Sequence, residues 1–475
     1  MEVVLILVAI QGLLGAFDTL YHHEFTEKLP WKESARKELL IHGIRNFFYF
    51  VIFISLAWVE WHGAYAYWFG LIFCLELGLT LWDFVVEDKT RKLPATERIT
   101  HTILTLNYGM VLAVMAPQWY AWLQQPSAFV GVNHGFLSWI ASLYALGVLL
   151  WTLRDLSSAM RSKKQSLPEL VLDVPQQRFL ITGGSGFIGK KLCQALINAG
   201  HEVTIFCRNN EKTAGQLTGR FTLVNQLDSL NTAFDVIINL AGEPISGKRW
   251  NKKRKALLLN SRLNITQALV DFIQRSEQKP SLFLSGSAIG YYGTSPEQIF
   301  TENTNAADNS FPHQLCAQWE QLALSAEQYG VRVVTLRTGV VLGLDGGALP
   351  ELLVPFDLFA GGTFGAGQQW MSWIHMHDFL GLIAHIINQP SIQGAINATA
   401  PTPVNNAEFS RVLGKVLKRP SKLSIPEANM KILLGEMAEE LLLKGQHVIP
   451  EKALASGYQF QYASLEAALK QLLGK

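Results

Sequence analysis

The sequence predicts two parts of different fold class: an all-α transmembrane bundle of about five helices, followed by an α/β domain built on a doubly wound parallel sheet. Two observations lead to this prediction. Long apolar stretches are confined to the first third of the chain, and from residue 178 to about 400 short strand patterns alternate with helix patterns. The composition agrees, because 49% of the 475 residues are hydrophobic and 16% are charged, which excludes a disordered chain.

Five apolar stretches are each close to the roughly 20 residues that a helix needs to cross a bilayer. They lie at about 3–21, 44–60, 63–86, 102–123 and 135–153. The first begins Met-Glu-Val-Val, without the basic residues that open a cleaved signal peptide, so we expect it to be retained. We therefore predict a transmembrane helical domain over residues 1–155, with the lipid bilayer as a partner. Buried helices of a soluble protein are the alternative.

Lys and Arg residues in the connecting segments indicate the orientation of this bundle, because cytoplasmic loops collect them. The connections after the first, third and fifth stretches carry Lys28, Lys32, Arg36, Lys37, Arg45, Lys89, Arg91, Lys92, Arg98, Arg154, Arg161, Lys163 and Lys164. The two other connections, around His62 and over residues 124–134, carry none. This alternation predicts an integral protein of the inner (cytoplasmic) membrane, with the N-terminus outside and the chain after Arg154 in the cytoplasm.

Residues 156–177 are polar and contain Pro168 and Pro175, which predicts a linker between the two parts. The formal net charge of +2 is too small to indicate a nucleic acid as partner. Four scattered cysteines show neither a metal-ligand spacing nor a disulfide framework, which fits a reducing compartment. Nothing in the sequence indicates an oligomeric state.

A strand, a glycine-rich turn and a helix open the second part. The strand is Arg178–Thr182, the turn reads Gly-Gly-Ser-Gly-Phe-Ile-Gly over residues 183–189, and the helix pattern continues to Ala199. This order is typical of a Rossmann-type dinucleotide site. A glycine-rich turn without a ligand is the alternative.

Each glycine of this turn has an expected role. Gly183 permits the tight turn, Gly186 lets a diphosphate approach the backbone, and Gly189 permits close packing of the helix on the strand. The helix opens at Phe187 and Ile188, so its first N–H groups and the positive end of its dipole would face the phosphates.

Two further strands define the rest of the cofactor site. Arg208 follows the second strand, 201–207, where an NAD site usually carries an acid for the ribose hydroxyls. A cation there suits a 2′-phosphate, so NADP(H) is favoured over NAD(H), unless Arg208 is only a solvated surface residue. A later strand, 235–240, ends in Leu240, Ala241 and Gly242, where small residues leave room for the cofactor.

Six motifs stand in order along the second part. They read Ile181-Thr-Gly-Gly-Ser-Gly-Phe-Ile-Gly189, Asn239-Leu-Ala-Gly-Glu243, Lys248-Arg-Trp250, Ser287-Ala-Ile-Gly-Tyr-Tyr-Gly293, Leu336-Arg-Thr-Gly-Val-Val-Leu342 and Ser372-Trp-Ile-His375. Together they resemble the atypical short-chain dehydrogenases/reductases of the NAD(P)-dependent epimerase/dehydratase-like family, and the tail from Pro426 to Leu469 resembles the small C-terminal domain of that family. The resemblance implies an extended Rossmann domain over 178–400, a small domain over 401–475, an NAD(P) cofactor and a small-molecule substrate.

The catalytic residues usual in this superfamily are absent. Its ordinary members use a Tyr-x-x-x-Lys helix, whereas the corresponding positions here hold Cys316 and Glu320, and a glutamate cannot replace the lysine cation. Ser285 or Ser287 would instead bind a substrate carbonyl, and Tyr291 or Tyr292, of which we favour Tyr292, would supply a phenolic proton. A packed aromatic side chain is the alternative for Tyr292.

Carboxylates and histidines lie at four predicted helix ends on the cytoplasmic side. They form the pairs Asp18/His22, Glu38/His42, Asp83/Glu87 and Glu97/His101, each at i, i+4 and so on one helix face. Such side chains, projected inward from four helices, are what a metal site in a bundle needs. Snorkelling or interhelical hydrogen bonds are the simpler explanation. Glu76 lies near the predicted membrane centre, where a carboxylate must be protonated, paired or functional.

The sequence therefore supports three functional hypotheses. The first is a membrane-tethered NADP(H)-dependent oxidoreductase or epimerase-like enzyme that acts on an unknown small molecule from the cytoplasmic side. The second is a catalytically inactive sensor or scaffold that binds NADP(H) and is coupled to the helices. The third is a membrane redox or metal centre fed by NADPH.

Overall fold

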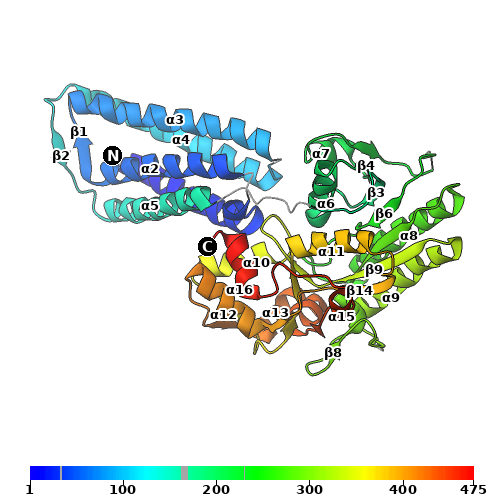
Figure 1. Ribbon diagram of the computed structural model, residues 1–475. Helices are drawn as coiled ribbons and strands as arrows, with labels where there is room; N and C mark the ends of the chain where they lie inside the picture. Colours follow the sequence, from blue (N-terminus) through cyan, green and yellow to red (C-terminus); the bar gives the residue numbers. More distant parts are fainter. Residues whose placement is uncertain (33–34, 92, 162–169, 229, 307) are drawn as a thin grey trace. The chain divides into compact units, whose positions relative to one another are not determined.

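A computed structural model describes residues 1–32, 35–91, 93–161, 170–228, 230–306 and 308–475 (Figure 1). The chain divides into two compact units, Met1–Lys164 and Gln165–Leu473. Part of the predicted linker, 162–169, lies outside the described residues, as do the basic residues Lys92, Lys163 and Lys164.

The first unit is a bundle of long helices that run side by side (Figure 1). They are α1 (Glu2–Phe17), α2 (Arg36–Trp58), α3 (Ala64–Thr90), α4 (Ala95–Leu123) and α5 (Phe136–Arg161), with a π-helical segment η1 (Asp18–Thr26) that continues α1 and a short 3-10 turn η2 (Leu29–Trp31). Within the described residues, five helices are long and apolar enough to cross a membrane. Each overlaps one of the predicted stretches, of which 44–60, 63–86 and 135–153 extend up to two residues beyond their helix, whereas insertion in a bilayer stays a prediction.

Helix α5 continues into the predicted linker. It passes residue 155 and reaches Arg161, the last described residue before 162–169, because Ala159 is buried against Leu29 and Leu39 of the same bundle. Packing of an apolar face against other helices stabilises a helix end whose local sequence alone would not keep it helical.

A two-stranded sheet joins two connections of the bundle. Strand β1 (Val59–Trp61) follows α2, and β2 (Phe129–Gly131) precedes α5. The strands pair antiparallel, so both connections lie at the same end of the bundle.

The second unit contains a parallel sheet that confirms the predicted doubly wound α/β fold. Among the described residues it has seven strands, in the order β14-β9-β7-β6-β3-β4-β5. Their bounds are β3 (Arg178–Thr182), β4 (Glu202–Phe206), β5 (Thr222–Val224), β6 (Val236–Asn239), β7 (Leu282–Ala288), β9 (Arg332–Thr338) and β14 (Gly394–Ala398). The strand order reverses between β3 and β6, which is where open α/β sheets bind ligands.

Helices cover both faces of this sheet. They are α6 (Phe187–Asn198), α7 (Asn210–Ala214), α8 (Lys252–Arg275), α9 (Phe311–Leu324) and α11 (Met376–Asn388). Phe179 and Ile181 of β3 are buried in a cluster with residues of α6 and α11. Leu180, which points to the opposite face, is buried with residues of α8 and α9. The core of the unit thus consists of two apolar layers with the sheet between them.

The C-terminal segment is tied to the sheet domain by short strand pairs. It contains β15 (Val404–Asn405), α12 (Asn406–Leu417), β16 (Leu423–Ile425), α13 (Glu427–Leu434), α14 (Glu436–Ala438), η6 (Glu439–Leu443), β17 (His447–Val448), α15 (Glu451–Ala455) and α16 (Leu465–Leu473). Strand β15 pairs with β12 (Trp370–Met371), β16 with β11 (Gly362–Phe364) and β17 with β8 (Ile299–Phe300). The predicted 401–475 segment therefore folds as part of one compact unit with the sheet.

The remaining elements connect these parts. They are η4 (Ile289–Tyr292), η5 (Ser325–Tyr329), β10 (Val340–Leu342), α10 (Leu349–Asp357) and β13 (Trp373–His375). Strands β10 and β13 pair in parallel beside the main sheet.

Candidate functional site

The glycine-rich turn lies at the carboxyl end of β3, where the strand order reverses. Gly183 has φ +73°, and a Cβ atom there would lie 2.7 Å from the carbonyl carbon of Leu240. A Cβ atom on Gly189 would lie 2.1 Å from the carbonyl oxygen of Gly183. Only glycine fits at these two positions, so the turn brings the backbone after β3 against the backbone after β6.

The N-terminus of α6 is open at this point. Gly186 is the N-cap of the helix, is exposed, and donates its own N–H to the carbonyl oxygen of Gly183 at 2.9 Å. A glycine N-cap has no side chain to accept from the first N–H groups of the helix, so these remain available to an anion.

Phe187 and Ile188, which were predicted to contact a cofactor, use their side chains elsewhere. A Cβ atom on Gly343, Gly346 or Gly347 would come within 2.9 Å of the Phe187 ring, so the ring packs on that loop. Ile188 packs against the core of the sheet domain. Their backbone N–H groups, which open α6, stay on the side of the glycine-rich turn.

An arginine missed in the sequence lies beside the predicted contact Gly242. A Cβ atom on Gly242 would lie 3.0 Å from Cζ of Arg262, whose guanidinium stacks over the ring of Trp319 at 5.2 Å. Burial lowers the pKa of Arg262, and Nε has no hydrogen-bond partner among the described residues. A partly buried cation with an unused donor at the mouth of a nucleotide site is suited to a phosphate or carboxylate. Ala241 is half-buried and precedes this glycine, and Arg208 is exposed directly after β4.

The positions of the missing Tyr-x-x-x-Lys residues are occupied by an internal ion pair. Cys316 and Glu320 are both buried on α9. Arg337 of β9 donates Nε to Oε1 and Nη2 to Oε2 of Glu320, both at 2.9 Å. Ser287 donates its hydroxyl to Oε1 of Glu320 at 2.6 Å. The carboxylate at the lysine position is therefore neutralised by an arginine that no local sequence pattern indicated.

Tyr292 belongs to the same network. Its hydroxyl donates to Oδ1 of Asn397 at 2.8 Å and accepts from Nη1 of Arg337 at 3.0 Å. Burial raises the pKa of Tyr292 to about 12, although Arg337 opposes the shift. Ser285 is wholly buried beside Asn239, with 3.5 Å between Oγ and the amide nitrogen. The hydroxyl protons of Ser287 and Tyr292 are therefore already used in hydrogen bonds within the protein. The catalytic roles of these residues stay predictions.

In the helical unit the structure brings most of the predicted carboxylates and histidines together. Ligand-type atoms of His23, Glu87, Glu97 and His101 lie within 4.8 Å of one another, as do those of Glu38, His42 and Glu87. Asp18 lies 3.3 Å from Nε2 of His101, and Asp83 lies 3.0 Å from Nε2 of His42.

His22 lies outside both of these groups, and its neighbour His23 belongs to one of them. His22 lies beside Thr100, 3.4 Å from the hydroxyl, while Nε2 of His23 lies 3.6 Å from Asp18. The segment from Asp18 to Thr26 is a π-helix, whose wider turn aligns residues about one position later than an α-helix does. The i, i+4 rule that paired Asp18 with His22 therefore fails here.

The carboxylate Glu76 is wholly buried, and its Oε1 accepts a hydrogen bond from Thr80 at 2.7 Å. This hydrogen bond joins residues one turn apart on α3. It gives one carboxylate oxygen of Glu76 a partner, and a carboxylate at this position was predicted to be protonated, paired or functional.

Comparison with known proteins places the second unit in a family. Residues 179–398 match the NAD dependent epimerase/dehydratase family, and residues 425–472 match a domain of unknown function, DUF1731. The epimerase family protein YfhF of Bacillus subtilis is 40% identical over 299 residues, which cover 62% of this chain and 97% of YfhF. The human epimerase family protein SDR39U1 is 36% identical over 298 residues, which cover 62% of this chain and 99% of the human protein.

Solved structures show the same likeness. The crystal structure of human SDR39U1 (isoform 2) with NADPH is 35% identical and has a TM-score of 0.57, covering 63% of this chain and 99% of that one. A nucleoside-diphosphate sugar epimerase from Corynebacterium glutamicum is 30% identical with a TM-score of 0.51, covering 73% of this chain and 67% of that one. A UDP-glucuronic acid 4-epimerase from Bacillus cereus, at 20% identity and a TM-score of 0.52, shares the fold.

Proposed function

Because this chain belongs, through its second unit, to the NAD-dependent epimerase/dehydratase family, we propose that it is an NADP(H)-dependent oxidoreductase or epimerase-like enzyme that acts on a small molecule. The observation that carries the proposal is the open N-terminus of α6 beneath the Gly183–Gly189 turn, at the reversal of strand order. Backbone N–H groups and a helix dipole at such a point bind a diphosphate.

Three features support NADP(H) as the cofactor. The similar human protein was crystallised with NADPH. Arg208 follows β4 and is exposed, at the position that approaches the 2′ substituent in Rossmann sites. Arg262 adds a second cation near Gly242. The bound cofactor supplies the hydride chemistry, and these residues bind and orient it.

The residues of this chain restrict how a proton reaches the substrate. The Ser287 hydroxyl donates a hydrogen bond to Glu320, and the Tyr292 hydroxyl donates one to Asn397. A substrate oxygen must therefore displace one of these hydrogen bonds or take its proton from water. This arrangement predicts slow turnover compared with a site that has a tyrosine activated by lysine.

A sensor that binds NADP(H) without turnover is the second candidate, because the Glu320–Arg337 pair occupies the place of the usual relay. Steady-state oxidation of NADPH by the full-length protein in detergent, with a panel of aldehydes and ketones, distinguishes the two. Oxidation that depends on a carbonyl compound supports the enzyme. Tight binding with no oxidation across the panel supports the sensor.

The cofactor preference is testable through Arg208. We expect the wild-type protein to bind NADPH at least about tenfold more tightly than NADH, and Arg208→Glu to remove or reverse that ratio, because the new carboxylate repels the 2′-phosphate. Calorimetric titration with both nucleotides measures the ratio. Arg411→Ala, at an exposed arginine of α12, serves as the control. Equal affinities in the wild-type protein, or an unchanged ratio in Arg208→Glu, would contradict the preference.

We further propose that the first unit anchors the protein in the inner membrane, with the sheet domain in the cytoplasm. Large apolar side chains are exposed on its helices, among them Trp82 at 66%, Leu106 at 65% and Leu143 at 68%. Such a surface requires a bilayer or another apolar partner.

Reporter fusions test this topology. Alkaline phosphatase is active only outside the cytoplasm, so we expect activity when it is inserted after Gly131, between α4 and α5, and none when it follows Lys475. A green fluorescent protein at Lys475 should fluoresce. The opposite pattern at the two positions would show that the orientation is inverted.

A further inference from the structure

One end of the helical bundle contains more negative than positive charge. Five carboxylates from four helical segments converge there: Asp18, Glu38, Asp83, Glu87 and Glu97. Each is at most 3% exposed. The guanidinium groups paired with them are those of Arg45, on Asp83, and Arg91, on Glu38, Glu87 and Glu97. Among the described residues, five ionised carboxylates against these two arginines leave three negative charges to be balanced in a buried place.

Two further histidine–carboxylate distances in the cluster are too long for hydrogen bonds. Nε2 of His23 lies 3.7 Å from Oε1 of Glu97, and Nδ1 of His101 lies 3.6 Å from Oε2 of Glu87. Atoms bound to one metal ion at about 2.0–2.2 Å lie about 3–4.4 Å from one another. The spacing of these atoms is therefore that of ligands around a common ion.

Several of the atoms that face the cluster have no hydrogen-bond partner among the described residues. They include Nε2 of His23, Oε2 of Glu87 and Nδ1 of His42, whose other ring nitrogen contacts Asp83. These residues are 7%, 0% and 2% exposed. A buried nitrogen or oxygen without a partner is costly, so atoms of this kind indicate a missing ligand.

Protonation of the histidines is a weaker explanation of the charge balance. The rings of His23 and His42 stack at 4.7 Å between centroids, with 7° between their planes. Two imidazolium rings stacked in this way would repel each other, so at least one ring stays neutral and offers a lone pair. Fewer than three histidine charges are then available from His23, His42 and His101, so the histidines alone do not balance three ionised carboxylates.

We propose that this end of the bundle binds a divalent first-row transition metal ion, with His23, Glu87, Glu97 and His101 as its ligands. Imidazole and carboxylate together favour Mn²⁺, Fe²⁺ or Zn²⁺ over Mg²⁺ and Ca²⁺. Arg91 donates to both oxygens of Glu97, and each carboxylate oxygen keeps a lone pair for the ion. Glu38 and His42 converge on the same Glu87 and lie next to the ion.

The π-helical segment is the element that makes this set possible. In an α-helix His22 would take the position beside Asp18, whereas the π-helix presents His23 to the cluster. Helix segments of this kind occur often at functional sites.

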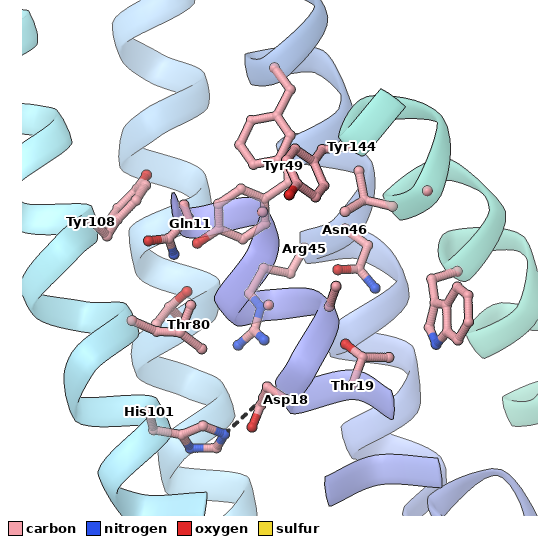
Figure 2. Close-up of a pocket in the computed structure, with 18 of the residues that line it drawn as sticks. Gln11, Asp18, Thr19, Arg45, Asn46, Tyr49, Thr80, His101, Tyr108 and Tyr144 are labelled. Atoms are coloured by element: carbon pink, nitrogen blue, oxygen red, sulfur yellow. Dashed lines mark hydrogen bonds and ion pairs between the residues drawn. The ribbon is translucent and has the colours of Figure 1, made fainter. Parts of the chain in front are cut away.

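A cavity of about 200 Å³ reaches the cluster from inside the bundle. Figure 2 shows Tyr49, Tyr108 and Tyr144 at its upper part, and Asp18 and His101 at its lower end. His101 therefore lines this cavity and also contributes to the proposed metal site.

Metal analysis of the full-length protein tests the proposal. The protein is purified in detergent without a histidine tag, incubated in turn with Mn²⁺, Fe²⁺ and Zn²⁺, and desalted. We expect about one equivalent or more of at least one of these metals to remain bound, as a preformed site requires. Less than about a tenth of an equivalent of all three would overturn the proposal.

Two pairs of variants distinguish this site from adventitious binding. His23→Ala and Glu87→Gln should lose at least about nine tenths of the bound metal, because each removes a ligand. His22→Ala and His62→Ala should retain it: the first alters the adjacent residue, and the second a histidine between α2 and α3. Retention of the metal in His23→Ala, or equal loss in His22→Ala, would overturn the ligand assignment.

A spectroscopic measurement keeps the test valid if a variant does not fold. Co²⁺ added to metal-stripped wild-type protein should give ligand-field bands that saturate near one equivalent, and excess Zn²⁺ should remove them. A spectrum equal to that of Co²⁺ in buffer would count against the site without any mutation.

Discussion

Replacing Gly186 by Asp is expected to abolish NADP(H) binding while the sheet domain stays folded. Gly186 is the N-cap of α6, and Asp is among the best N-cap residues, so the helix itself should not lose stability. The new carboxylate would stand where the diphosphate binds. Two unit charges about 4 Å apart repel by about 4 kcal/mol near a protein surface, so we expect affinity to fall at least about 100-fold. Calorimetric titration with NADPH, together with a thermal unfolding curve, measures both effects.

Gly186→Asn is the matched control. A Cβ atom at this position lies 3.1 Å from the carbonyl oxygen of Gly183, so Asp and Asn introduce the same crowding and differ in charge alone. The asparagine variant should therefore keep much more of the affinity. Equal losses in both variants would attribute the effect to shape, and wild-type binding by Gly186→Asp would contradict the proposed diphosphate site.

Removing Arg337 is expected to produce the largest loss of stability. Arg337→Leu leaves Glu320 buried without its counter-ion and removes a donor from Tyr292. Breaking a buried pair in this way costs about 3–5 kcal/mol. For a domain of this size we expect the midpoint of thermal unfolding to fall by about 6–20 °C. Differential scanning fluorimetry of the full-length protein measures the change.

The double variant separates the ion pair from simple packing. Arg337→Leu/Glu320→Leu no longer buries an unpaired charge, so it should recover a large part of the lost stability. Arg411→Ala breaks an exposed pair with Glu408 and should change the midpoint little. If the double variant were as unstable as Arg337→Leu, the loss would have to be assigned to the volume of the side chain.

The parts of the fold that depend on local pattern could be predicted from the sequence. Strand β3 forms at Arg178–Thr182, and α6 begins at Phe187, within the glycine-rich segment 183–189. Both follow from neighbouring residues, since alternation and glycine spacing are local properties. The five long helices are likewise recognised by their apolar length.

The parts that depend on tertiary contact could not. Glu320 and Arg337 lie on different elements, α9 and β9, and no periodicity links them. Arg262 has the sequence environment of any helical arginine, and only its contact with Trp319 and Gly242 distinguishes it. That His23 and not His22 faces the cluster depends on a π-helix. Such a segment has no reliable local signature in the sequence, and it shifts every later residue around the helix axis.

The strand pair β8–β17 also constrains how the protein is made. Ile299–Phe300 must wait for His447–Val448, which are translated long after them. The sheet domain therefore completes this strand pair only after Val448 has been translated, and a nascent chain stalled before β17 would expose an unpaired edge at β8. Such an edge recruits other strands, so truncated products of this gene are expected to need chaperones or rapid proteolysis.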